Sequence, residues 1–90
     1  RGDVVAVAKR DLKVGEVLDG EGGYTVWGKL VPAQRSLSLG GLPIGLAHRM
    51  ALRRPVARGQ IVTWEDVAID QQDSAVAFRR EMEQVFQTLN

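Results

Sequence analysis

The stretch AKRDLKVGEVL at residues 8–18 decides the fold, because its pattern returns 44 positions later as LRRPVARGQIV at residues 52–62. The shift places Gly15 on Gly59 and superposes the apolar residues around them. The matched apolar pairs are Leu12 with Val56, Val17 with Ile61, and Leu18 with Val62. Glycine adopts the positive φ of a tight turn without a steric penalty. The repeat therefore predicts two related arms of short strands, with hairpin tips at the two glycines.

The segments outside the repeat predict further short elements. Between the copies, alternation predicts a strand over residues 24–31, and a proline favours one short helical turn over residues 31–37. Residues 40–47 contain too many glycines and prolines for a helix, so we expect an extended or winding segment. After the second copy, Thr63 and Asp66 have the spacing of a capping box, which predicts a short capped turn.

The C-terminal segment is predicted to be an amphipathic helix. Asp73 or Ser74 can cap a helix that runs to about Leu89. Its apolar residues fall at spacings of three and four on one face, namely Ala75, Phe78, Met82, Val85 and Leu89. A stripe this short is not a stable coiled coil alone, so the helix must dock on this domain, on another subunit or on another domain. We therefore divide the chain into a domain over residues 1–72 and a docking helix over residues 73–90.

Composition excludes several classes of protein. The chain has 90 residues and no cysteine, which excludes disulfide scaffolds, thiolate metal sites and cysteine nucleophiles. Its longest apolar stretches, residues 4–8 and 42–47, are far shorter than the roughly 20 residues of a membrane helix. No secretory signal opens the chain, and we expect a cytoplasmic protein without a membrane partner. With one histidine and no supporting spacing motif, we predict no metal site, no catalytic residue and no cofactor-binding residue here.

Charge is segregated along the chain. Residues 22–64 carry six basic side chains and no acidic one, whereas residues 1–21 and 65–90 are net acidic. The basic stretch either faces an anion, such as a phosphate or a carboxylate, or is neutralised when the acidic tail folds back on it. The candidates for contact with an anionic substrate are Lys29, His48, Arg49, Arg53 and Arg54. A formal net charge of only +1 argues against nucleic acid as a partner.

The two arms together resemble the SAF domain, a family named for sialic acid synthase, type III antifreeze protein and flagellar P-ring chaperones. The first arm matches the family pattern at Ala8, Asp11, Leu12, Gly15 and Leu18, and the second at Gly59, Val62, Thr63, Asp66 and Val67. The resemblance implies a mainly β fold called a β-clip, in which short twisted strands fold over with pseudo-two-fold symmetry. Short helical turns and the C-terminal α-helix would complete it.

A second resemblance concerns the segments GGYTVWGKL at 22–30, GLPIGLAH at 41–48 and VAID at 67–70. They look like the C-terminal end of bacterial homoserine-dehydrogenase-like NAD(P)-dependent oxidoreductases, which include 1-deoxyxylulose-5-phosphate reductoisomerase-like enzymes. This resemblance implies a non-catalytic tail whose partners are upstream catalytic domains of the same chain, where NAD(P) binds. Such a tail would support assembly, including that of a homo-oligomer, or contact an anionic substrate. The alternatives are a free-standing binding module for a sugar acid or a partner protein, and a flagellar P-ring chaperone-type domain.

Overall fold

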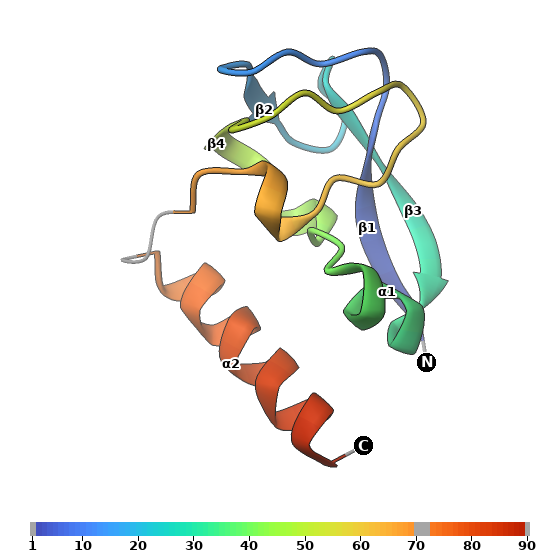
Figure 1. Ribbon diagram of the computed structural model, residues 1–90, viewed down its shortest axis with the longest axis vertical. Coiled ribbons are helices and arrows are strands. Elements are labelled where there is room, and N and C mark those ends of the chain that lie inside the picture. The colour runs from blue at the N-terminus through green and yellow to red at the C-terminus, as the bar shows by residue number, and fades with distance from the viewer. Residues whose placement is uncertain (1, 70–72, 90) are drawn as a thin grey trace.

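The computed structural model describes residues 2–69 and 73–89, which form two small antiparallel sheets and several helical segments (Figure 1). Strand β1 (Gly2–Ala8) pairs with β3 (Val26–Pro32), and β2 (Val17–Asp19) pairs with β4 (His48–Ala51). The helical segments are α1 (Ala33–Leu39), α2 (Ser74–Leu89) and the 3-10 turns η1 (Ile44–Leu46) and η2 (Trp64–Asp66). The prediction of a mainly β fold of the β-clip type, with short helical turns and a C-terminal helix, is confirmed.

The two copies of the repeat pair with each other. Leu12 and Val56, which the shift of 44 positions superposes, form an antiparallel bridge with reciprocal N–H···O bonds of 2.8 and 3.1 Å. Farther out, the Ala8 amide donates to the Gln60 carbonyl oxygen at 3.0 Å. The equivalent amide of the second copy, Leu52, makes the equivalent bond to the first copy at 2.8 Å. A pseudo-two-fold axis therefore passes through the Leu12–Val56 bridge.

The turns at Gly15 and Gly59 are tight, but they are not hairpin tips. Both glycines have positive φ, 89° and 82°, and each turn is closed by a hydrogen bond between backbone groups three residues apart. Strand β2, which follows the first turn, nevertheless pairs with β4 rather than with the segment before the turn. The prediction of hairpin tips is wrong because a turn sequence specifies only a local bend. Burial of apolar side chains decides which segment becomes the partner.

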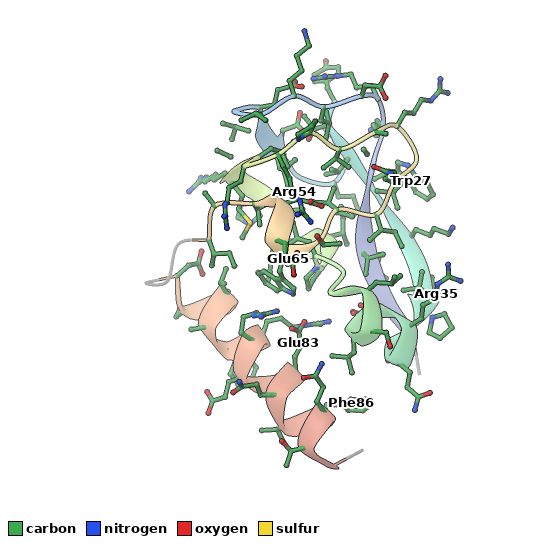
Figure 2. The ribbon with its side chains drawn as sticks, in the orientation of Figure 1. Trp27, Arg35, Arg54, Glu65, Glu83 and Phe86 are labelled. Carbon is green, nitrogen blue, oxygen red and sulfur yellow. The ribbon has the colours of Figure 1, made fainter. Side chains whose placement is uncertain are left out.

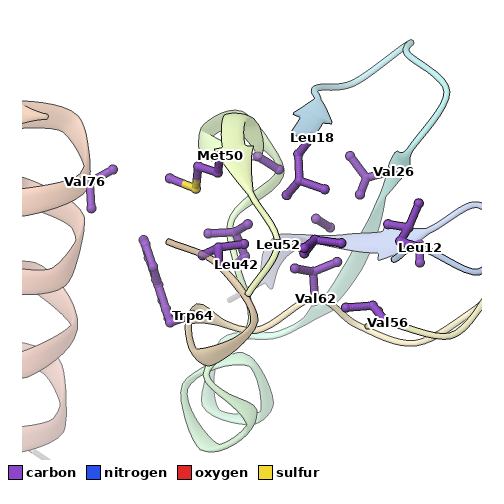
Figure 3. Packing of buried hydrophobic residues seen from close by; sticks show 14 residues of the cluster. Leu12, Leu18, Val26, Leu42, Met50, Leu52, Val56, Val62, Trp64 and Val76 are labelled. Carbon is purple, nitrogen blue, oxygen red and sulfur yellow. The ribbon is translucent and has the colours of Figure 1, made fainter. Parts of the chain in front are cut away.

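Both copies supply the hydrophobic core, which Figure 3 shows from close by. Equivalent residues of the two copies, such as Leu18 and Val62, are buried together. The cluster also includes Leu12, Val26, Leu42, Met50, Leu52 and Val56. Complete burial of a valine or leucine side chain stabilises a fold by roughly 1.5–3 kcal/mol. The Trp64 ring lies at the edge of this core, where it faces Val76 of α2 (Figure 3).

The elements between the copies follow the predictions with small shifts. The predicted strand is β3, and α1 begins directly after Pro32 and extends farther than one turn. Residues 40–47 are extended apart from η1, and isolated bridges join them to neighbouring segments. In the predicted capping box at η2, the Asp66 carboxylate accepts a hydrogen bond from the Thr63 amide at 2.8 Å.

Helix α2 covers the predicted residues, but its apolar stripe is exposed instead of buried. The Asp73 carboxylate caps its first turn by accepting a hydrogen bond from the Ala75 amide at 2.9 Å. The side chains of Phe78, Met82 and Val85 are 65%, 44% and 55% exposed. These three side chains are therefore not packed in the core, and the surface on which the stripe docks stays a prediction. The predicted boundary between residues 72 and 73 falls on a segment outside the described residues. Neither helix in the described ranges has the length and apolarity that a membrane crossing requires.

Candidate functional site

Strand β4 carries a bulge at Arg49. Pairing with β2 joins Val17 to Ala51 but Asp19 to His48, so β4 holds one more residue than β2 between these pairs. Arg49 has a φ of 59°, and no other non-glycine residue of ranges 2–69 and 73–89 has a positive φ. This conformation costs an L-residue roughly 1–2 kcal/mol. Bulges re-aim side chains, often beside functional sites. Because of the bulge, the Arg49 side chain does not follow the alternation of a regular strand.

Three basic side chains lie at or near this bulge in a short segment, His48, Arg49 and Arg53, which we call the cationic edge. All three residues are exposed, and none of their side chains forms a hydrogen bond or ion pair with another described residue. The backbone amide of Arg53 donates to the Asp66 carbonyl oxygen at 2.7 Å, which fixes the end of the segment on η2. The cationic edge therefore has a fixed backbone and unneutralised side chains.

Arg54 is different from its neighbours because it already has partners. Its Nε donates to Asp66 Oδ1 at 2.5 Å, and a terminal nitrogen lies 3.4 Å from Glu65 Oε2. The hydrogen bond to Asp66, helped by the nearby Glu65 charge, raises the pKa of the Arg54 guanidinium above its usual value. Arg54 therefore stabilises the turn at η2, and it is the weakest of the five predicted anion contacts.

Lys29 is separated from the other candidates. It lies on β3, which belongs to a different sheet from β4 and runs along the other side of the molecule (Figure 1). Figure 2 shows Arg35 near the end of β3, whereas Arg54 lies near the centre of the view, close to Glu65. The predicted set of anion contacts thus divides in space, with Lys29 apart from the cationic edge.

The acidic tail neutralises little of the basic stretch. Within the described part of the chain, its Glu65 and Asp66 pair with Arg54. In α2, Glu83 pairs instead with two arginines of its own helix, Arg79 at 2.8 Å and Arg80 at 3.1 Å. Among the described residues, the tail therefore forms ion pairs with one cation of the basic stretch, Arg54.

One acidic residue beside the cationic edge was not singled out from the sequence. The Asp19 carboxylate accepts hydrogen bonds from the Tyr24 amide at 2.7 Å, from the Thr25 amide at 3.0 Å and from the Thr25 hydroxyl. The Thr25 hydroxyl and then the Tyr24 amide lower the pKa of Asp19 to about 2. Because Asp19 pairs with His48 across the β2–β4 ladder, these bonds hold a glycine-rich loop next to the edge. An aspartate followed by glycine is a recognisable turn signal that could have indicated this loop.

Other chemistry is sparse in the part of the chain that the structure describes. No three His, Cys, Asp or Glu side chains in those ranges lie together in a group that could hold a metal ion. His48 has no carboxylate partner there that would orient its ring as a general base. The arrangement is suited to binding an anion through unpaired cations.

Comparison with known families matches residues 3–68 to the SAF domain. The matched range includes both arms, the cationic edge and Lys29, and it ends before α2. No curated protein matches the chain. The SAF resemblance read from the sequence is thus confirmed, and the resemblance to homoserine-dehydrogenase-like enzymes stays a prediction.

Proposed function

The chain belongs to the SAF domain family, and from this we propose that it is the non-catalytic SAF module of a homoserine-dehydrogenase-like NAD(P)-dependent oxidoreductase. In this proposal the module meets an anionic group of the substrate with its cationic edge, His48, Arg49 and Arg53. The NAD(P) cofactor and the reacting groups belong to upstream catalytic domains of the same chain.

The observation that carries the proposal is the conformation of Arg49. A glycine would adopt its φ of 59° without a penalty, yet the position holds an arginine that has no side-chain partner among the described residues. The conformational cost is therefore not returned by a contact inside the domain. A bound anion would supply the missing contact, because a guanidinium forms paired, charge-assisted hydrogen bonds with phosphate and carboxylate groups.

The neighbours of Arg49 support the same reading. Arg53 adds a second guanidinium on the same segment, and the ionised Asp19 holds the loop beside His48 by hydrogen bonds to that loop's own amides. The Asp19 carboxylate is thereby occupied with its loop, and its hydrogen bonds to described residues go to Tyr24 and Thr25 rather than to the cationic edge. The positive charges of the edge thus stay available to a ligand.

An NMR titration of the ¹⁵N-labelled chain tests the proposal with inorganic pyrophosphate as the probe. We expect amide shifts centred on residues 48, 49 and 53. Arg49→Gly should weaken pyrophosphate binding about tenfold, which corresponds to 1.4 kcal/mol. It should not destabilise the fold, because glycine accepts the positive φ that costs an arginine roughly 1–2 kcal/mol.

The matched control is Arg58→Gln, which removes a cation of the same basic stretch at the distant Gly59 turn. Equal losses in the two variants would show that binding follows net charge and would refute the cationic edge. Tight binding of NADPH by the chain alone would contradict the assignment of the cofactor to upstream domains. Tighter binding of gluconate than of pyrophosphate would favour the alternative of a free-standing module for a sugar acid.

A further inference from the structure

Helix α2 is attached to the clip through its polar face. Arg79 donates to both carboxylate oxygens of Asp3 on β1, at 2.5 and 3.3 Å. The Arg80 guanidinium lies over the Trp64 ring, 4.8 Å from its centroid. Val76, one turn before, is buried against the same ring (Figure 3). These contacts fix the rotation of the helix about its own axis.

As a consequence, the apolar stripe of Phe78, Met82 and Val85 stays outside the core and remains exposed. Rotation of the helix would bury these side chains, but it would break the Asp3–Arg79 bonds and move Val76 into water. An apolar stripe that the fold holds outward is typical of a surface that packs against another chain.

A groove runs beside the stripe, between α2 and the elements α1 and β1, with a cavity volume of about 400 Å³. Its apolar lining comes from both walls, and includes Gly2, Ala33, Leu37, Phe78, Met82 and Phe86. Figure 2 shows Phe86 and Glu83 on the side of α2 that faces α1. The stripe and the groove together form one continuous apolar surface.

We propose that this surface pairs with the same surface of a second copy of the chain, with the two α2 helices antiparallel about a two-fold axis. The spacing of the stripe supports a helix as its partner, because alternating steps of three and four residues form a straight seam along a second helix with that spacing. A two-fold axis makes one patch sufficient for both sides of the interface.

The charged neighbours of the stripe select the register. When Met82 lies opposite Val85 of the second copy, Glu81 lies near Thr88, so no like charges meet. When Met82 instead lies opposite Phe78 of the second copy, the exposed Glu81 side chains of the two copies meet across the axis. Like charges at this distance are unfavourable. The first register is therefore the one we expect.

The size of the seam indicates a weak dimer. A stable interface buries roughly 800 Å² on each partner, whereas the stripe offers three exposed large apolar side chains, Phe78, Met82 and Val85. We expect concentration-dependent association with a dissociation constant between roughly 10 μM and 1 mM.

Sedimentation equilibrium tests the association. The wild-type chain should approach twice the mass of one copy at high concentration, and Val85→Lys should remain monomeric. The matched control, Gln87→Lys, adds the same charge at an exposed position of the helix away from the stripe and should associate like the wild type. A wild-type chain that is monomeric at about 1 mM would overturn the proposal and leave the surface to another protein or domain. Equal behaviour of the two lysine variants would also overturn it.

Cross-linking tests the register, and the natural absence of cysteine makes it clean. Met82→Cys and Val85→Cys chains are mixed in equal amounts and oxidised. A disulfide requires closely opposed Cβ atoms, so the antiparallel register predicts the mixed Met82→Cys/Val85→Cys product well above its random share of one half. Predominance of the two symmetric products would refute the antiparallel arrangement, because it would place equivalent residues opposite each other.

Discussion

Replacing Leu12 by alanine tests whether the two arms share one core. Leu12 is 1% exposed and lies on the pseudo-two-fold axis, bonded through its backbone to Val56. The substitution removes buried carbon atoms and leaves a cavity between the arms, which costs roughly 2–5 kcal/mol. A domain of this length has a free energy of unfolding of about 5–13 kcal/mol. We therefore expect Leu12→Ala to remove at least about a sixth of the free energy of unfolding.

Urea unfolding followed by tryptophan fluorescence measures this loss, because Trp64 lies at the edge of the core. The matched control is Val14→Ala, since Val14 lies in the neighbouring turn and is 61% exposed. The control should change the free energy of unfolding by no more than about 0.5 kcal/mol. A Leu12→Ala variant as stable as this control would show that Leu12 is not in a shared core, and the pairing of the arms would have to be abandoned.

The remaining predictions concern the turns, the loop beside β2 and the attachment of α2. Gly15→Ala and Gly59→Ala each place a Cβ in open space, so the only cost is that of a positive φ in alanine. Urea unfolding should show that each variant lowers the free energy of unfolding by roughly 1–2 kcal/mol. Losses that differ strongly between the two variants would contradict the pseudo-symmetry. Because hydrogen bonds hold the pKa of Asp19 at about 2, its stabilising contribution is complete above its ordinary pKa of 3.8 and is lost as the pH falls towards 2. Titration of the Asp19 carboxyl carbon by NMR checks this, and a midpoint near 3.8 would show that the bonds are absent in solution. Asp3→Asn should speed hydrogen exchange of the α2 amides, whereas Glu81→Gln, on the same helix, should not; equal exchange in both would mean that Asp3 does not hold the helix.

Local signals in the sequence predicted the local structure. The repeat placed turns at Gly15 and Gly59, both of which have the positive φ that the residue type suggested. The Asp73 cap gave the start of α2 to within a residue. These features depend on a few neighbouring residues, and a single sequence contains all of them.

Those local signals did not predict which segments pair or pack when they are far apart in the sequence. The turn at Gly15 does not say which strand β2 will meet, because that depends on burial with a segment more than thirty residues away. The periodicity of α2 defines an apolar face, but the contacts of Asp3 and Trp64 decide that the opposite face docks. No feature of the sequence predicted the positive φ of Arg49, because such a conformation is expected of glycine.

The candidate site was predicted in part. The absence of acids from residues 22–64 drew attention to a basic stretch, and His48, Arg49 and Arg53 of that stretch have no side-chain partners among the described residues. Sequence alone did not separate these from Arg54, whose partners come from η2, or from Lys29, which lies on the other sheet. Both distinctions follow from the arrangement of the arms.

Pairing between the arms is the central claim, because it lays β4 against β2 and thereby builds the cationic edge. Scalar coupling across hydrogen bonds measures this pairing directly by NMR. We expect a coupling between the Leu12 nitrogen and the Val56 carbonyl carbon, and the reciprocal one from Val56 to Leu12. Couplings confined to residues 8–18 or to residues 52–62 would show two local hairpins and would contradict the claim.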